Sequence, residues 1–496
     1  MPAIQKHEMP DILFFFSDQH HGLYAGYAGH PLVQTPNLDR LAANGTACRA
    51  AYTSCPLCVP ARSSMLTGQL PSQNGVFNNA HAIRSDQATF LHALGAVGYE
   101  TVLCGRMHFK GPDQRHGFTR RICGDITGGY AGGPASRDAL KQTFGMGGCV
   151  NAAGKGDSPV LEYDRAVIEA ALDYLRQDHV KPQCIVVGTY GPHFPYVAPP
   201  EYFDLYFGKT SAPASWDPEG NDANPLVDAK RQRSRLSPLH GEQVPVTTDV
   251  MLTARAAYFG MITEQDRLLG EVRDAWGTYL KRTGRDGIFA YSSDHGDTCG
   301  EHSVFGKQTF YEGSTRIPML FEGTGIAAGH ILENPVSIMD IGPTLCGLVN
   351  ADAPPCQAGV SLSAPLRNET ANPSRPILSE WVQDFEGRTV AGRMVRKDAW
   401  KLMRYDDDRI PDQLFDVEKN PDELENCAAQ QPDVLASLQT ELERNWDPQR
   451  IAREYAERQH HIACLGRWSQ TQRPSDSPED RRPVPVEAIP DPDIVA

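Results

Sequence analysis

The chain of 496 residues lacks any apolar run that approaches the ~20 residues of a membrane-spanning helix. Its first apolar run, Ile12–Phe16, is short, and the segment before it, Met1–Pro10, is polar. That segment has neither a stretch of at least ~7 apolar residues nor a small-residue cleavage site, so it does not read as a secretory signal. The sequence therefore predicts a cytoplasmic protein with no membrane partner.

Basic residues are too few for a general nucleic-acid-binding protein. The chain has 47 Lys and Arg against 62 Asp and Glu, which gives a formal net charge of −15. Phosphate backbones and anionic lipid surfaces attract proteins with an excess of positive charge. We therefore expect no nucleic acid among the partners.

Cysteine is also sparse. Twelve cysteines in 496 residues are too dilute for a disulfide scaffold, and a reducing compartment keeps most of them as buried thiols. The only Cys-x-x-Cys pair, Cys55 and Cys58, has no second pair with which to complete a zinc site. A zinc or disulfide framework is thus not indicated.

The remaining composition, 40% apolar and 22% charged, is ordinary for a globular protein. Apolar runs alternate with helical patterns, which predicts an α/β fold. The predicted strands are Asp11–Phe16, Thr101–Cys104, Cys184–Val187 and Gly287–Tyr291. The predicted helices here are Pro36–Asn44, with Thr35 as N-cap, and Tyr163–Gln177. The stretch Thr210–Val244 lacks periodicity and reads as a surface excursion.

The pattern changes near residues 365–376, where short strand-like runs begin. These runs are Ile377–Trp381, Arg393–Val395 and Trp400–Arg404, and one helix is predicted at Pro432–Asn445. We predict a catalytic domain at residues 1–375, a small C-terminal subdomain with an antiparallel sheet and a helix at 376–450, and an extension or arm at 451–496. The last part of this arm, Gln470–Ala496, is rich in proline and acidic residues.

A polar cluster follows each of the four main predicted strands. The clusters are Ser17-Asp18-Gln19-His20, Gly105-Arg106-Met107-His108, Gly191-Pro192-His193 and Ser292-Ser293-Asp294-His295-Gly296-Asp297. In an open parallel sheet, ligands bind outside the carboxyl ends of the strands. We therefore expect the four clusters to converge on one site.

Between the first two of these strands, a helix is predicted to begin near Cys58 and to end at Gly68. Pro60 is favoured in the first turn of a helix, and Gly68 is favoured just after the last helical residue. The N-terminus of a helix favours an anion, and Arg62, four residues after Cys58, lies on the same face and could bind a tetrahedral oxyanion. This pattern indicates a nucleophile with an anion receptor beside it.

Here the sequence resembles a family. Cys58-x-Pro60-x-Arg62 followed by Thr67-Gly68 resembles the signature of the type I sulfatases of the alkaline phosphatase superfamily. Two further stretches match the family in the expected order. The first is Gly98-Tyr99-Glu100-Thr101-Val102-Leu103-Cys104-Gly105-Arg106-Met107-His108, which has Arg106 where the family usually has Lys. The second is Asp294-His295-Gly296-Asp297 with Gly306-Lys307. The pairs Asp18-Gln19 and Asp294-His295 look most like those of choline sulfatases and phosphonate monoester hydrolases. The resemblance implies an alkaline-phosphatase-like, mostly parallel central sheet flanked by helices.

The resemblance also implies a site. Its metal ligands are Asp18, Gln19, Asp294 and His295. Its catalytic residues are Cys58, Arg62, His108, His193 and Lys307. Its substrate-binding residues are Asn79 and Arg106, the latter facing either the sulfate or a carboxylate of the substrate. The metal is divalent, with Ca²⁺ favoured and Mn²⁺ or Mg²⁺ as alternatives because of His295.

In the family, the cysteine that corresponds to Cys58 is oxidised to formylglycine by a maturation enzyme, and its hydrate is the nucleophile. The resemblance thus implies hydrolysis of a small alkyl or aryl sulfate monoester to alcohol and inorganic sulfate. His193 is expected to protonate the leaving oxygen and His108 to take a proton from the hydrate. Two alternatives stay open: a phosphonate monoester or phosphodiester hydrolase with the same site, or a metal and oxyanion binding protein with unconverted Cys58. The resemblance to choline sulfatases, whose tails mediate oligomers, also implies a homo-oligomer formed through the C-terminal arm.

Overall fold

The computed structural model describes residues 9–111, 113–127, 149–222, 224–239, 242–355 and 358–472. An eight-stranded sheet runs through the main body, in the order β14-β2-β13-β11-β1-β7-β4-β5. These strands are β1 (Asp11–Asp18), β2 (Thr46–Cys48), β4 (Glu100–Gly105), β5 (Arg120–Cys123), β7 (Gln183–Pro192), β11 (Gly287–Ser293), β13 (Met319–Gly323) and β14 (His330–Leu332). Only the pairs β11–β13 and β13–β2 are antiparallel, so the predicted mostly parallel sheet is confirmed.

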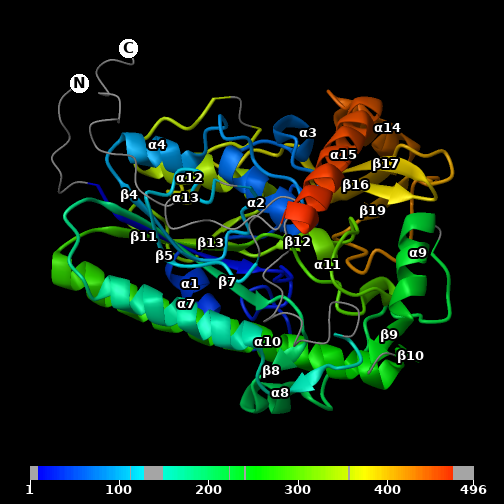
Figure 1. Cartoon of the computed structure of the whole chain (residues 1–496), viewed down its shortest axis with the longest axis horizontal. Coiled ribbons are helices and arrows are strands. Elements are labelled where there is room, and N and C mark those ends of the chain that lie inside the picture. Colours follow the sequence, from blue (N-terminus) through cyan, green and yellow to red (C-terminus); the bar gives the residue numbers. More distant parts are fainter. Residues whose placement is uncertain are drawn as a thin grey trace.

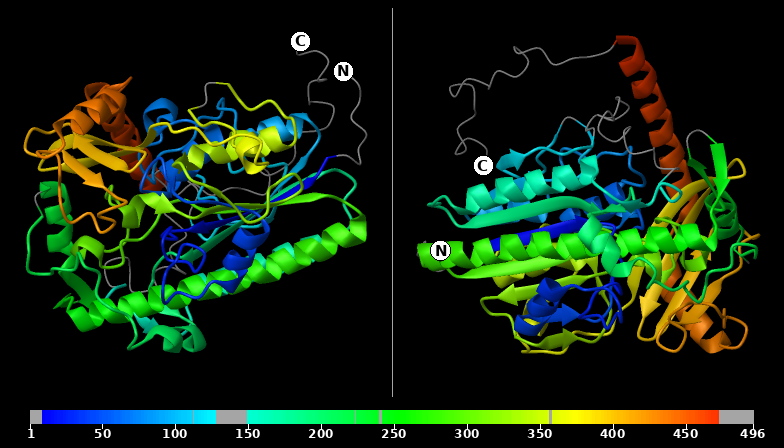
Figure 2. Two further views of the ribbon diagram at one scale, coloured as in Figure 1. Left: turned by 180° about the vertical axis from the view of Figure 1, so that it is seen from behind. Right: turned by 90° about the horizontal axis from the view of Figure 1, so that it is seen from below.

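Helices cover both faces of this sheet (Figures 1 and 2). One face carries α2 (Cys58–Thr67), α4 (Phe90–Ala96) and α12 (Ile341–Leu348), and the other carries α1 (Pro36–Asn44), α7 (Pro159–Leu175) and α10 (Thr248–Thr283). Strand β1 shows why its sequence is apolar throughout. Phe14 and Phe16 pack in the first layer, whereas Leu13 and Phe15 pack in the second, so both of its faces are buried.

All four main predicted strands are present, as β1, β4, β7 and β11, and the predicted helices are present as α1 and α7. Thr35 is the N-cap residue of α1, as predicted, although another side chain supplies the cap hydrogen bonds. Thr35 makes no side-chain cap hydrogen bond; the carboxylate of Asp266, on α10, accepts from the backbone N–H groups of Asn37 and Leu38 at 3.0 and 2.8 Å. Helix α10 itself was not predicted, because it is buried along most of its length and lacks a clear polar face.

The C-terminal part contains a four-stranded antiparallel sheet, as predicted, with one strand more than expected. Its strands are β16 (Ile377–Phe385), β17 (Arg388–Lys397), β18 (Trp400–Tyr405) and β19 (Gln413–Asp416). Helix α14 (Pro432–Glu443) packs on it. Helix α15 (Pro448–Gln472) begins the expected arm, and residues 473–496 lie outside the described residues. The boundary at residue 375 stays a prediction.

The excursion at residues 210–244 is more regular than its sequence indicated. It holds α9 (Pro225–Ser234) and the antiparallel strands β9 (Leu236–Leu239) and β10 (Glu242–Pro245). The Asn224 side chain accepts from the N–H of Leu226 and so caps α9, with Pro225 in its first turn. The predicted surface excursion thus contains a capped helix and a strand pair, which its lack of periodicity did not indicate.

Shorter elements complete the described chain. They are β3 (Ala51–Tyr52), β6 (Gly154–Lys155), β8 (Val197–Ala198), β12 (Arg316–Ile317), β15 (Val336–Ser337), α3 (Pro71–Asn74), α8 (Pro200–Tyr206), α11 (Glu312–Thr315), α13 (Ser363–Leu366), η1 (Glu301–Ser303) and η2 (Ile338–Asp340). Among the described helices, none combines the length and hydropathy that crossing a bilayer requires.

Candidate active site

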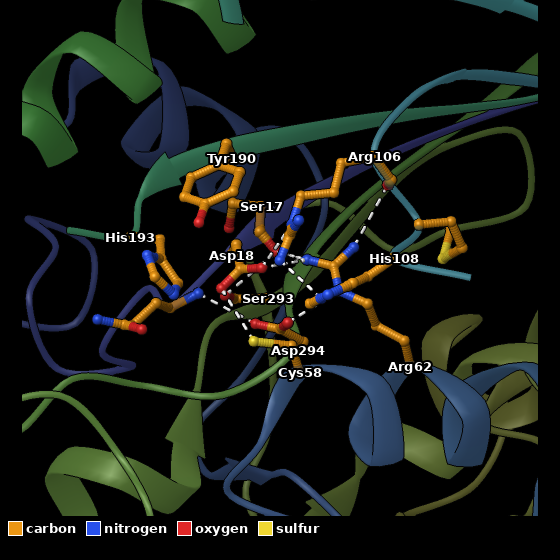
Figure 3. Close-up of polar contacts among 12 residues, drawn as sticks. Ser17, Asp18, Cys58, Arg62, Arg106, His108, Tyr190, His193, Ser293 and Asp294 are labelled. Atoms are coloured by element: carbon orange, nitrogen blue, oxygen red, sulfur yellow. Dashed lines mark hydrogen bonds and ion pairs between the residues drawn. The ribbon is translucent and has the colours of Figure 1, made fainter. Parts of the chain in front are cut away.

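The four polar clusters that follow β1, β4, β7 and β11 meet at one edge of the sheet, because these strands are parallel neighbours. The side chains of Asp18, Arg106, His193 and Asp294 converge there, and Cys58 reaches them from the N-terminus of α2 (Figure 3). Gly68 ends α2 with a φ of 68°, a conformation that glycine adopts without strain.

Four side chains form a compact group of potential metal ligands. One ligand atom from each of Asp18, Cys58, Asp294 and His295 lies within 4.8 Å of the others, and all four residues are buried. Burial alone would raise the pKa of Asp18, but the charges of Arg106, His193, Arg62 and Lys307 hold it well below its usual range. The Asp18 carboxylate is thus ionised and available to a cation.

Arg62 connects the two carboxylates. Its Nε donates to Asp294 Oδ2 at 2.8 Å and its Nη2 to Asp18 Oδ2 at 3.1 Å. Its Nη1 and Nη2 also donate to the carbonyl oxygens of Arg106 and Ser17, each at 3.3 Å. In this structure the guanidinium therefore orients the carboxylates, and its expected contact with a substrate oxyanion stays a prediction.

Arg106 points inward, toward the carboxylate of Asp18. Its Nε donates to Asp18 Oδ2 at 2.8 Å, and its guanidinium lies 4.3 Å from the centre of the Tyr190 ring. The chain can approach β7 this closely because residue 188 is glycine: a Cβ there would lie 1.9 Å from the Arg106 carbonyl oxygen. Arg106 therefore points into the site, and its predicted contact with the substrate stays a prediction.

The thiol of Cys58 lies beside one donor, Lys307, and one nitrogen lone pair, on Nε2 of His295, whose Nδ1 faces the Gly296 carbonyl oxygen at 3.0 Å and so carries the proton. Lys307 Nζ lies 3.0 Å from Sγ and His295 Nε2 lies 3.3 Å from it. Burial and the charge of Asp18 raise the pKa of the thiol, but Lys307 and a hydrogen bond with His193 outweigh them and lower it. Position 58 is therefore built to stabilise negative charge.

The two predicted catalytic histidines are held in opposite ways. His193 Nδ1 lies 2.7 Å from the carbonyl oxygen of Phe194, which can only accept, so this nitrogen carries the proton and Nε2 has the lone pair in the neutral ring. His108 Nδ1 lies 2.8 Å from Nη2 of Arg106, which can only donate, so here Nδ1 has the lone pair. Burial is the first cause that lowers the pKa of both histidines.

The remaining predicted site residues, Gln19 and Asn79, lie beside the residues described above. Gln19 donates from Nε2 to Asp297 Oδ2 at 2.5 Å, and its Oε1 accepts from Lys307 at 2.8 Å. Asn79 Oδ1 accepts from the N–H of Val59, at 2.9 Å, in the first turn of α2. The structure thus brings every predicted site residue to the site or to the helix that carries Cys58.

Three further histidines close to the predicted site residues in the sequence have structural partners instead. His20, His21 and His302 are buried. His20 Nδ1 lies 2.6 Å from the Tyr291 hydroxyl, and the ring of His302 stacks on Tyr311 at 3.6 Å. These side chains fill the fold around the site.

Two residues of the site were missed by the sequence reasoning. Tyr190 lies in the buried strand β7, where its residue type gave no signal. Asp125 comes two residues after β5 and accepts from the N–H groups of Met107 and His108 at 3.1 and 2.7 Å. A polar residue just after a strand was the signal used elsewhere, but β5 was too short to be recognised.

The carboxylate of Asp18 has an oxygen that a divalent cation could bind. Within the described residues, Asp18 Oδ1 has no hydrogen bond other than a long one from the Cys58 thiol, at 3.8 Å. It lies 3.7 Å from His295 Nε2 and 4.0 Å from Lys307 Nζ. A buried carboxylate oxygen so weakly paired fits a hard cation, which prefers oxygen ligands.

Known proteins with similar sequences cover most of the chain. The family model described as Sulfatase matches residues 10–351, and a model described as N-sulphoglucosamine sulphohydrolase, C-terminal, matches residues 300–449. A choline-sulfatase from Rhizobium meliloti (strain 1021) is 35% identical over 438 residues, which cover 84% of this chain and 82% of the relative. Arylsulfatase K from Homo sapiens is 28% identical over 457 residues, which cover 87% and 81%.

Solved structures show the same fold. The phosphonate monoester hydrolase of Agrobacterium radiobacter superposes with a TM-score of 0.70 over 92% of this chain and 96% of its own, at 21% identity. At that identity the likeness concerns the fold alone. It confirms the α/β architecture with its flanking helices and small C-terminal sheet.

Proposed function

Since the chain belongs to the sulfatase family and is therefore a sulfuric ester hydrolase, we propose that it hydrolyses a small alkyl or aryl sulfate monoester to alcohol and inorganic sulfate. The observation that carries this proposal is the position of Cys58. It lies at the N-terminus of α2, with Lys307 3.0 Å from Sγ and two carboxylates within reach of the same point.

The proposal includes conversion of Cys58 to formylglycine by a maturation enzyme. The hydrate of that aldehyde supplies a hydroxyl as nucleophile and a second hydroxyl that allows sulfate to leave. The side chains now facing the thiol would then face the hydrate. Lys307, which donates to both Gln19 and position 58, would hold a developing oxyanion there.

Asp18, Asp294, His295 and Gln19 would hold a divalent metal, Ca²⁺ in the first instance because oxygen ligands predominate. Such a cation supplies positive charge that acidifies a bound hydroxyl and polarises sulfate oxygens. For Gln19 to contribute Oε1, Lys307 must share that oxygen. Arg62 pairs with both aspartates and would keep them close together for such a cation.

His193 is proposed to protonate the leaving oxygen. The carbonyl of Phe194 holds its Nδ1–H, so the proton that is gained and lost is the one on Nε2. Burial and Lys307 lower the pKa of His193, so the ring, once it has gained a proton on Nε2, gives that proton up more readily than a free imidazole does.

The leaving group is proposed from the relatives. Choline sulfate is the first ester to test, because the 35% identical relative is a choline-sulfatase. Phosphonate monoesters and phosphodiesters form the second set, because a phosphonate monoester hydrolase shares the fold. We also propose that the protein forms a homo-oligomer.

Two measurements test the function. The mass of the tryptic peptide Ala50–Arg62, from protein made in its native host, should show an aldehyde in place of the Cys58 thiol. Rates on the ester panel should then vanish in Cys58→Ala and persist in Cys55→Ala, a matched control three residues earlier and equally buried. An unmodified thiol in a host that matures other such enzymes would favour the binding-protein alternative.

A further inference from the structure

The hydrogen bonds around Arg106 determine which nitrogen of His108 carries a proton. Arginine has only donors, so Arg106 Nη2, 2.8 Å from His108 Nδ1, requires a lone pair on that nitrogen. The pKa of His108 is well below its usual value, first because the ring is buried and then because Arg106 is charged. The ring is thus neutral at physiological pH and carries its single proton on Nε2.

Asp125 holds both partners of this contact. Its Oδ2 accepts the N–H groups of Met107 and His108, at 3.1 and 2.7 Å, and its Oδ1 lies 3.6 Å from Arg106 Nη1. Thr127 donates to the same Oδ1 from its hydroxyl at 2.7 Å, and its hydroxyl accepts from Arg106 Nη1 at 3.1 Å. The Asp125 side chain is 7% exposed. One carboxylate therefore braces the backbone of His108 and the guanidinium that faces its ring.

The backbone at His108 needs such a brace. Its φ is 60°, in the left-handed region that residues with a side chain rarely adopt. A conformation of this kind persists only where the surroundings enforce it. The 2.7 Å hydrogen bond from the His108 N–H to Asp125 supplies that constraint.

We propose that Asp125 is a positioning residue that, through Arg106, fixes His108 as a neutral imidazole with its proton on Nε2. His108 then meets the substrate as a hydrogen-bond donor to a sulfate oxygen, and it does not accept a proton from the nucleophile at that nitrogen. This role differs from the base expected from the sequence. Its kinetic part rests on the proposed function, whereas the protonation of His108 does not.

The protonation is measured directly by NMR on the resting full-length protein labelled with ¹⁵N in histidine. The two ring nitrogens of a neutral imidazole resonate far apart, and the signals of His108 are assigned as those missing in His108→Gln. We expect a neutral ring with the proton on Nε2. A proton on Nδ1, or on both nitrogens at neutral pH, overturns the proposal whether or not the protein hydrolyses any ester.

Variants test the role of Asp125. Asp125→Asn should lower kcat/KM on the best ester by about 10–100-fold, the usual effect of removing a hydrogen-bonded partner of a site residue. It should also give His108 a mixture of proton positions. Thr127→Val removes one hydroxyl and no charge. It should lower kcat/KM and mix the proton positions of His108 in the same direction as Asp125→Asn, but by a smaller amount.

Asp340→Asn is the matched control. Asp340 is buried, pairs with Arg375 and accepts the N–H groups of Ser337 and Val360, and none of these residues belongs to the active site. This control should keep both the rate and the His108 signals. If Asp125→Asn behaves like Asp340→Asn in both measurements, Asp125 does not position the site. If Asp125→Asn does not fold, Thr127→Val decides: unchanged His108 signals and rate refute the brace.

Discussion

Removal of Arg62 should destabilise the metal-free protein far more than the loss of an ordinary polar contact. Its side chain is 1% exposed and pairs with two carboxylates that are themselves fully buried, Asp18 and Asp294. Breaking a buried ion pair leaves an uncompensated charge and costs about 3–5 kcal/mol. Unfolding entropy of about 2.1 cal/mol/K per residue gives about 1 kcal/mol/K for a chain of this length. Arg62→Ala should therefore lower Tm by about 3–5 °C.

Calcium should reverse part of this loss. Without Arg62, the two carboxylates attract a cation more strongly, and a ligand that binds the folded state tightly raises its stability. Melting curves are compared with EDTA and with excess Ca²⁺ for the wild type, Arg62→Ala and Arg393→Ala. The last variant is the control, because Arg393 is equally buried but pairs with Glu380 in the C-terminal sheet.

Either of two results would contradict this account of Arg62 and the carboxylates. A Tm decrease of less than about 1 °C for Arg62→Ala would mean that the carboxylates are not left uncompensated. A calcium-induced rise in Tm no greater for Arg62→Ala than for Arg393→Ala would mean that removal of Arg62 does not strengthen cation binding, and no rise in any of the three proteins would mean that Asp18 and Asp294 do not bind the cation.

Three further predictions concern proton transfer, the metal and pH. His193→Ala should slow esters with poor leaving groups by about 10²–10⁴-fold and activated aryl esters much less, and an equal loss on both would argue against an acid role. Chelation should abolish hydrolysis and added Ca²⁺ should restore it; full activity in demonstrably metal-free protein would contradict the assigned ligands. Burial raises the pKa of Asp164 to about 7, so its contribution to stability should fall by up to ~4 kcal/mol as pH rises from about 4 to about 7. Asp164→Asn should remove this fall, and denaturation curves at pH 4 and pH 8 that change equally in both proteins would refute the assignment.

Local sequence patterns were sufficient to predict the main strands and the helix that position the site. Strand β1 is buried on both faces and ends at Asp18. Helix α2 begins at Cys58 and is ended by Gly68, as its sequence indicated. These features depend on a few adjacent residues, and short-range sterics and hydrogen bonding determine them. Helix α10 could not be read in this way, since its burial comes from the layers that pack around it.

The sequence alone determined which chemical groups are available: a cysteine at a helix N-terminus, carboxylates after two strands, and histidines and lysine in family-like motifs. Tertiary structure decided how those groups act on one another. Only the packed fold sets Arg106 against His108 and Asp125 against both, and so places a proton on one nitrogen of a ring. The reason is physical: residue type fixes what a side chain can donate or accept, but its charge state and proton position depend on burial and on neighbours from distant parts of the chain.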